Sequence, residues 1–430
     1  MQTTHSLIAR VTTLRARDTL RLLALCCATT ATATMAGQEQ PGTIALVSST
    51  AEGLARGGYE PCGLSTDGRF ITFHSESKGL VQGDTNGIGD VFMKDISTGA
   101  VQRVNTSATG KQWAQSTFCK QVTPDARYVL LQREREVLLK DLQTGKVTTV
   151  SPAADSIAEN TGFSAGSVSD DGQRVAFVTV PTQIYLGGYT WVNKVPARIM
   201  ISDLATGSLS TLDTDNGRTA DGEIVLGHQN ARLSPDGTRV AFVSNANFLV
   251  PGDTNGQPDV FVRELATGTT ILASSGSDGR GGELQVCCFQ SYYHVEWANN
   301  QVLQFSTTQA HSLGPVGDYL KHLDSGRLEL LLASADGAQP LVSPDLSTVV
   351  FSRLYGSGWD YRIYQRNRAT GVEQVLSSSA NGKLSNGNAN LNLISRSGTQ
   401  VAFNANASNL VRPKPPAGSY QVYVKTLAAP

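Results

Sequence analysis

The stretch Leu233-Ser-Pro-Asp-Gly-Thr-Arg-Val-Ala-Phe242 decides the fold, because variants of it recur along most of the chain. Each well-preserved copy joins a short polar turn to a β-branched, apolar run with alternating character. The copies, of which the fifth is the most degenerate, begin at Leu64, Val122, Val168, Leu233, Glu296, Val342 and Ile394. Their spacing of roughly 45 to 65 residues is typical of propeller blades. The sequence therefore predicts seven repeated β units.

Each copy continues with a further strand and a glycine turn. Asp259-Val-Phe-Val-Arg-Glu264 is one such strand, and Thr267-Gly268 follows it. Glycine supplies the positive φ that a tight hairpin requires. With a short strand before the polar turn and another after the glycine, every copy predicts one blade of four antiparallel strands.

The two ends of the repeat region predict how the ring closes. The seventh copy ends at Gln421-Val-Tyr-Val-Lys425 without a last strand, whereas Thr43-Ile-Ala-Leu-Val47 stands before the first copy. We expect residues 43–48 to supply the outermost strand of the blade that residues 390–427 begin, because closure removes an exposed edge. The predicted fold class is all-β, a seven-bladed β-propeller over residues 43–427 whose ring is closed by an N-terminal strand.

The N-terminal segment has the features of a secretory signal. Four arginines precede a short apolar run at residues 22–28, and Ala31-Thr-Ala33 and Thr34-Met-Ala36 are candidate cleavage sites. We expect residues 1–36 to be a signal peptide and the mature protein to be periplasmic or extracellular. No later segment is long and apolar enough to span a membrane.

Export permits disulfides. Cys62 and Cys119 both fall just before the polar turn in neighbouring copies, so a bridge between adjacent innermost strands is geometrically reasonable. Cys287 and Cys288 could form a vicinal disulfide. Buried free thiols are the alternative for all four, since spacing alone never determines connectivity.

Charge restricts the class of partner. The chain has a formal net charge of -1 and no basic run, so nucleic acid is not an expected partner. We expect a monomer that binds a protein or a glycan.

Two similar loops predict possible calcium sites. Gly83-Asp-Thr-Asn-Gly-Ile-Gly-Asp90 and Gly252-Asp-Thr-Asn-Gly-Gln-Pro-Asp259 each carry three oxygen side chains at matching positions. The candidate ligands of Ca²⁺ are Asp84, Asn86, Asp90, Asp253, Asn255 and Asp259. The structural alternative is an Asx-type turn in which these side chains bond to their own backbone.

A second constellation predicts a ligand site at one mouth of the central channel. Polar and aromatic residues precede the innermost strands of three copies, where they should line the channel. The candidate ligand-binding residues are Glu60, His228, Gln229, Asn230, Arg232, Tyr292, Tyr293 and His294. Clustered titratable groups are only probabilistic markers of a site, so polar channel lining with bridging water is the alternative.

The Ser-Pro-Asp-Gly turn followed by a Val-Ala-Phe strand resembles the TolB-type, WD40-like propeller repeat of exported bacterial proteins. The longer form from Leu249 to Arg263 resembles a common variety of it. The resemblance covers residues 43–427 and implies the fold, whereas such propellers carry many different activities.

The function expected is a non-catalytic protein-binding or glycan-binding scaffold of the bacterial envelope, without catalytic residues. One alternative is a polysaccharide lyase that performs uronate β-elimination with His228, Arg232, Tyr293 and His294. The other alternative is a structural surface protein stabilised by Ca²⁺.

Overall fold

The computed structural model describes residues 43–153, 162–180, 183–187, 190–193, 197–212, 229–244, 246, 248–251, 253, 258–275, 294–307, 314–335, 338–356 and 360–427. All regular elements in these ranges are β-strands. The same ranges contain no helix that is long and apolar enough to cross a bilayer.

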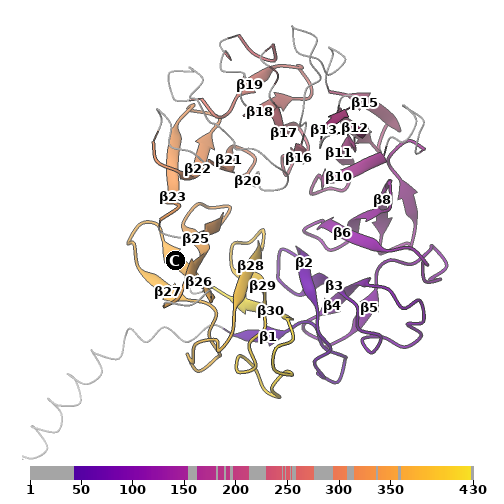
Figure 1. Ribbon diagram of the computed structural model, residues 1–430, viewed down its shortest axis with the longest axis vertical. Coiled ribbons are helices and arrows are strands. Elements are labelled where there is room, and N and C mark those ends of the chain that lie inside the picture. Colours follow the sequence, from indigo (N-terminus) through magenta and orange to yellow (C-terminus); the bar gives the residue numbers. More distant parts are fainter. Residues whose placement is uncertain are drawn as a thin grey trace, which may run out of the picture. The chain divides into compact units, whose positions relative to one another are not determined.

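Seven four-stranded antiparallel sheets surround a central channel and form a β-propeller, as the repeats predicted (Figure 1). Blade 1 consists of β2 (Tyr59–Leu64), β3 (Phe70–Ser75), β4 (Asp90–Asp95) and β5 (Val101–Arg103). Blade 2 consists of β6 (Thr117–Val122), β7 (Tyr128–Arg133), β8 (Glu136–Asp141) and β9 (Val147–Thr149). Blade 3 consists of β10 (Gly162–Val168), β11 (Arg174–Val180), β14 (Ile199–Asp203) and β15 (Ser208–Thr211). Blade 4 consists of β16 (Gln229–Leu233), β17 (Arg239–Ser244), β18 (Asp259–Glu264) and β19 (Thr270–Leu272).

The remaining blades repeat this order from the innermost strand outwards. Blade 5 consists of β20 (Val295–Asn299), β21 (Val302–Ser306), β22 (Gly317–His322) and β23 (Leu328–Ala333). Blade 6 consists of β24 (Ala338–Val342), β25 (Thr348–Leu354), β26 (Tyr361–Asn367) and β27 (Glu373–Val375). Blade 7 consists of β28 (Ala389–Ile394), β29 (Gln400–Ala405), β30 (Gln421–Thr426) and β1 (Ile44–Leu46). A separate hairpin pairs β12 (Gln183–Gly187) with β13 (Thr190–Asn193).

The outermost strand of blade 7 comes from the other end of the repeat region. β1 pairs antiparallel with β30, with Ile44 opposite Lys425. The hydroxyl of Ser48, just after β1, accepts a hydrogen bond from the Val422 amide at 3.0 Å. Other blades contain the same contact after their own fourth strand, as in the bond from the Val137 amide to Ser151 Oγ at 3.1 Å. The N-terminal strand therefore takes the same structural role as the fourth strands of the other blades.

The polar turn of the repeat is held by one hydroxyl and one carboxylate. In blade 1, Ser65 Oγ donates to Asp67 Oδ1 at 2.6 Å and accepts from the Phe70 amide at 2.9 Å. Asp67 Oδ1 also accepts from the Arg69 amide at 3.0 Å. The hydrogen bond from Ser65 is the main cause that lowers the pKa of Asp67. The same serine- or threonine-to-aspartate bond recurs at Thr123–Asp125, Ser169–Asp171, Ser234–Asp236 and Ser343–Asp345.

Adjacent turns also contact each other. The Thr66 amide donates to the Pro124 carbonyl at 2.8 Å, and the Asp170 amide donates to the Pro235 carbonyl at 2.8 Å. These bonds join blade 1 to blade 2 and blade 3 to blade 4. The turns therefore lie together at one end of the channel, which we call the turn end.

The hydrophobic core lies within and between blades. In five blades the aromatic residue that ends the repeated stretch faces an aromatic residue on the next strand, as in Phe242 and Phe261, whose ring centroids are 5.6 Å apart. Blade 7 has the equivalent pair, Phe403 and Tyr423, at 5.5 Å. Such pairs contribute roughly 0.5–1.5 kcal/mol beyond the burial of their area. This packing explains why the repeat carries an aromatic residue at its end.

Buried lysines join several blades to their neighbours, a role that the sequence analysis missed. Lys140 on β8 donates to the Thr106 carbonyl of blade 1 at 2.7 Å. Lys425 on β30 donates to the Ser378 carbonyl of blade 6 at 2.8 Å. Lys94 donates to the carbonyls of Ser49 and Thr50 at 3.1 and 2.8 Å, and Lys321 donates to the Ser275 carbonyl at 2.8 Å. Burial lowers the pKa of Lys140 to about 8, and that of Lys425 to about 8.

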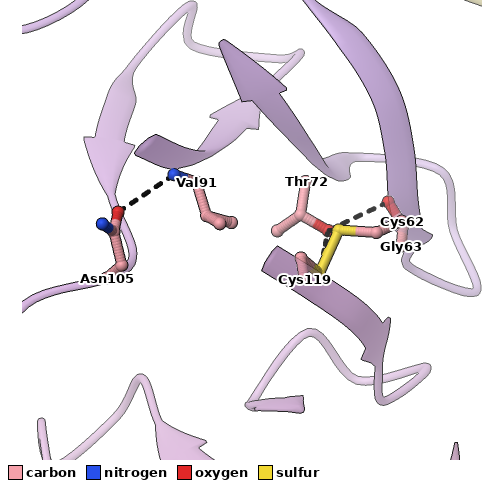
Figure 2. Close-up of a disulfide and its surroundings, with 6 residues drawn as sticks. All are labelled: Cys62, Gly63, Thr72, Val91, Asn105 and Cys119. Atoms are coloured by element: carbon pink, nitrogen blue, oxygen red, sulfur yellow. Dashed lines mark hydrogen bonds between the residues drawn. A yellow bond between two sulfur atoms is a disulfide. The ribbon is translucent and has the colours of Figure 1, made fainter. Parts of the chain in front are cut away.

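The innermost strands of blades 1 and 2 are joined by a disulfide between Cys62 and Cys119, the pairing that the sequence suggested (Figure 2). The two Cα atoms are 5.8 Å apart. Figure 2 shows the Thr72 hydroxyl beside the bridge, 3.3 Å from Cys62 Sγ and 3.5 Å from the Gly63 carbonyl oxygen. Cys287 and Cys288 lie outside the described residues.

We expect the disulfide to stabilise the propeller. The bridge closes a loop of 57 residues, and removal of such a bridge costs about 2–4 kcal/mol, largely through unfolded-state entropy. The Cys62→Ser/Cys119→Ser double variant should lose this amount in urea unfolding, and reduced wild type should lose a similar amount. Equal stability of the oxidised wild type and the double variant would contradict the bridge.

We expect Lys140 to make stability depend on alkaline pH. Its folded pKa of about 8 lies below the unfolded value of roughly 10.4. Between these values the unfolded chain binds more protons, so the free energy of unfolding rises with pH. From pH 8 to 10, wild type should gain on the order of 1 kcal/mol relative to Lys140→Met. Lys146→Met, at an exposed site in the same blade, is the control and should follow wild type. If the difference in free energy of unfolding between wild type and Lys140→Met does not change with pH, the lowered pKa of Lys140 is contradicted.

Candidate functional site

A cavity of about 320 Å³ lies in the central channel, and residues of all seven blades line it. Such a volume is at the lower end of the range for small-ligand sites. Its titratable side chains come from different blades, which the fold alone brings together. They are Lys120, Asp170, Arg232, His294, Glu296 and Arg396.

An ion pair crosses the channel at the turn end. Arg396 in blade 7 donates through Nε to Asp170 Oδ2 at 3.1 Å and through Nη2 to Asp170 Oδ1 at 3.0 Å. Blades 7 and 3 are not neighbours in the ring, so this bidentate pair spans the channel. It links two blades on opposite sides of the cavity at its turn end.

The sequence carries a signal for this pair that the sequence analysis missed. The position after the turn serine or threonine is proline in three copies, at Pro124, Pro235 and Pro344. Asp170 and Arg396 occupy the same position in their own copies. Opposite charges thus replace proline in two turns, but only the ring places these turns across the channel from each other.

Arg232 lies on β16, with its charged end in the cavity. Its Nη1 donates to the Gly166 carbonyl at 2.6 Å, and its Nε lies 3.5 Å from Glu296 Oε2. The Trp297 indole donates to the Arg232 carbonyl at 2.8 Å. These contacts orient the guanidinium but neutralise it only partly, because the Glu296 side chain is 47% exposed and water screens such a pair.

His294 precedes β20 and is held through Nδ1. That atom lies 3.4 Å from Gln304 Nε2 and 4.0 Å from Asp318 Oδ1. Ser306 Oγ donates to Asp318 Oδ1. Burial raises the pKa of Asp318 to about 6 and lowers the pKa of His294. The imidazole is therefore neutral at pH 7, and Nε2 has no hydrogen-bond partner among the described residues.

Lys120 lies on β6 and contributes a second cation to the cavity. Burial lowers the pKa of Lys120, and the positive charge of Arg232 lowers it further, whereas Glu60 acts in the opposite direction. Glu60 lies within β2 rather than before it, because a register shift between Tyr59 and Gly63 bulges the strand. Its backbone has a φ of 47°, which is uncommon for a residue other than glycine.

The structure brings together some of the residues that the sequence suggested. Arg232 and His294 line one cavity, and Glu60 is close enough to Lys120 to influence its charge. Gln229 and Asn230 belong to β16, and their side chains lie outside the description. His228, Tyr292 and Tyr293 also lie outside the described residues. Sequence reasoning missed Lys120, Asp318 and Glu296, which occur in strands whose polar positions have no distinctive pattern.

The first predicted calcium loop is closed by an internal cation. Arg103 Nε lies 3.0 Å from Asp90 Oδ2, and Arg103 Nη2 lies 3.5 Å from Asp84 Oδ1. Asn86 directs its amide nitrogen to Asp90 Oδ1 at 3.2 Å, while its oxygen accepts from the Ile88 amide at 3.2 Å. The single guanidinium contacts both carboxylates and offsets one of their two charges, so calcium binding at this loop stays a prediction. The arrangement agrees with the Asx-type alternative.

The second predicted calcium loop is only partly described. Asp259 Oδ1 accepts a hydrogen bond from Ser274 Oγ at 2.6 Å, and Asp253 is buried. Asn255 lies outside the described residues, so calcium binding there stays a prediction. Across the described parts of the chain, the acidic, histidine and cysteine side chains form no group of three or more suited to a metal ion.

We expect the ion pair across the channel to stabilise the ring. Asp170→Arg and Arg396→Asp should each lose about 1 kcal/mol in urea unfolding, because each places like charges across the channel. The double variant, with the charges exchanged, should recover most of the loss. Raised salt should shrink the coupling. Additive losses in the double variant would show that the two side chains do not interact.

Comparisons with known proteins find the fold but no family. No family model and no curated protein matches this chain. A solved oligogalacturonate lyase in complex with manganese is similar over 90% of this chain and 96% of its own, with a TM-score of 0.53 and 14% identity. TolB from Acinetobacter baumannii covers 84% of this chain and 82% of its own, with a TM-score of 0.37 and 14% identity. The Pyrococcus horikoshii acylaminoacyl peptidase covers 87% of this chain and 52% of its own, with a TM-score of 0.49 and 10% identity. The chain is thus a propeller similar in fold to the lyase, and at this identity the likeness extends no further.

Proposed function

We propose that this chain is an exported, monomeric propeller that acts as a non-catalytic binding or scaffolding module of the bacterial envelope. Its ligand, part of a glycan or a protein, would insert a group into the central channel. The observation that carries this proposal is the cavity of about 320 Å³ to which all seven blades contribute side chains. Residues 1–36 would direct export as a signal peptide.

The chemistry of the lining supports binding. Several of its polar groups are already engaged by the protein: the Gln121 side chain bonds to the Val168 backbone, and Gln304 Nε2 donates to the Pro340 carbonyl at 2.6 Å. The wall is therefore rigid, and its charged groups remain accessible. A preformed cavity with a few convergent polar groups is the usual form of a ligand site.

A second candidate function is a polysaccharide lyase. The observation that favours it is His294, which is held through Nδ1 near Gln304 and Asp318 and lines the cavity together with Arg232. In this role His294 would abstract the proton beside a uronate carboxylate, and Arg232 would neutralise that carboxylate. The lyase solved with manganese gives a precedent for this activity on a propeller fold but does not transfer it to this chain.

We expect a ligand to stabilise the mature protein through the cavity. A thermal-shift screen would use acidic and neutral oligosaccharides together with short peptides. A Leu341→Trp variant should narrow the cavity, because Leu341 lines it, and should abolish the shift. Leu330→Trp, at a site 40% exposed on the outermost strand β23, is the matched control and should keep it. A ligand that shifts both variants equally would place binding elsewhere and refute the proposal.

The same screen separates binding from catalysis. Each acidic sugar that binds would be followed by absorbance at the unsaturated-uronate band. Binding without a rise in absorbance supports the non-catalytic module. A rise that the His294→Ala variant loses would establish the lyase instead.

A further inference from the structure

Lys120 differs from the buried lysines of the propeller, because its side chain lines the cavity and is exposed. Lys140 and Lys425 each donate to backbone carbonyls of a neighbouring blade, at 2.7 and 2.8 Å, so these ammonium groups hold the ring together. The ammonium of Lys120 lies in the cavity lining and makes no hydrogen bond or ion pair with any described residue. A structural role of the kind that Lys140 has is therefore absent here.

A second cation lies near Lys120. Arg232 comes from blade 4 whereas Lys120 comes from blade 2, yet the charge of Arg232 is close enough to lower the pKa of Lys120. Arg232 Nη2 has no hydrogen-bond partner among the described residues, because Nη1 bonds to Gly166 and the contact with Glu296 uses Nε. Two cations that repel each other in a confined space are stabilised when an anion binds between them.

The lining carries one positive charge in excess, since Lys120, Arg232 and Arg396 face two carboxylates, and Glu296 lies 3.5 Å from Arg232 Nε. Asp170 and Arg396 neutralise each other at the turn end. His294 is neutral because burial lowers its pKa. The amides of Gln121 and Gln304 are occupied by backbone partners. Asn392 also lines the cavity, with its Oδ1 engaged by the Asn404 amide. The two cations nevertheless favour recognition of charge over recognition of sugar hydroxyls.

We propose that the cavity is a carboxylate pocket, in which Lys120 and Arg232 together bind an acidic group. A cavity of about 320 Å³ has room for the end of a chain or a side group. The carboxylate belongs to a sugar acid or to the acidic end of a peptide. The inference rests on the proposed function in that it takes the cavity to be the ligand site.

The experiment uses pairs of probes that differ in a single carboxylate. Calorimetry at low ionic strength and pH 7 would compare D-glucuronate with D-glucose, and a short peptide with a free C-terminus with its amide. The acid of at least one pair should bind about tenfold or more tightly than its neutral partner. Lys120→Met and Arg232→Met should each remove that preference, and Lys120→Arg should retain most of it. Lys111→Met, which removes an exposed lysine outside the cavity lining, is the control and should bind as wild type does.

The outcomes separate this inference from the proposed function. The pair that responds identifies the source of the carboxylate, and a response in both pairs means that the carboxylate alone is recognised. Equal binding of acid and neutral probes, with affinity lost in Leu341→Trp, overturns the carboxylate pocket but leaves binding in the channel intact. Failure of both acids to bind at millimolar concentration overturns the carboxylate pocket. Binding that neither Lys120→Met nor Leu341→Trp weakens overturns both.

Discussion

The hydrogen-bonded turn between the two innermost strands is the constraint on which the rest of this propeller depends. One hydroxyl, as in Ser65, donates to the turn aspartate and accepts from the backbone, which fixes the angle between the strands of each blade. The same turns bond to their neighbours, as from the Thr66 amide to the Pro124 carbonyl. A short polar motif thus sets both the shape of a blade and its spacing from the next, and the central channel follows from that spacing.

Charge inside the channel is distributed unevenly. At the turn end, Asp170 and Arg396 form a bidentate ion pair that links blade 3 to blade 7 across the channel. Deeper in the lining, Lys120 and Arg232 are two cations with a single loose acidic contact, between Arg232 and Glu296. This uneven distribution is the basis of the proposal that the channel receives an acidic ligand.

The role of a local motif in this propeller depends on the residues that other strands place beside it. The loop from Asp84 to Asp90 has the oxygen pattern of a cation site, yet Arg103 on β5 supplies the positive charge from within the blade. Local spacing does not reveal such a partner. In contrast, the position of Cys62 and Cys119 was interpretable, because both precede the same motif in consecutive repeats and adjacent blades must place equivalent positions side by side.

The sequence by itself determined the number of blades, their four-stranded pattern and the pairing of residues 43–48 with the last blade. These features follow from a periodic pattern, because consecutive repeats in the sequence are neighbours in the fold. The sequence suggested the Cys62–Cys119 bridge, which the structure decided. It also indicated that Arg232 and His294 face the channel. Only the tertiary structure decided that Asp170 meets Arg396 across 226 residues of sequence, that Lys120 lies beside Arg232, and that Asp318 lies near His294. Asp170 and Arg396, like Lys120 and Arg232, belong to blades that are not consecutive, whereas His294 and Asp318 approach each other within blade 5. No local pattern encodes either kind of proximity, and the chemistry of the channel emerges only when the ring is formed.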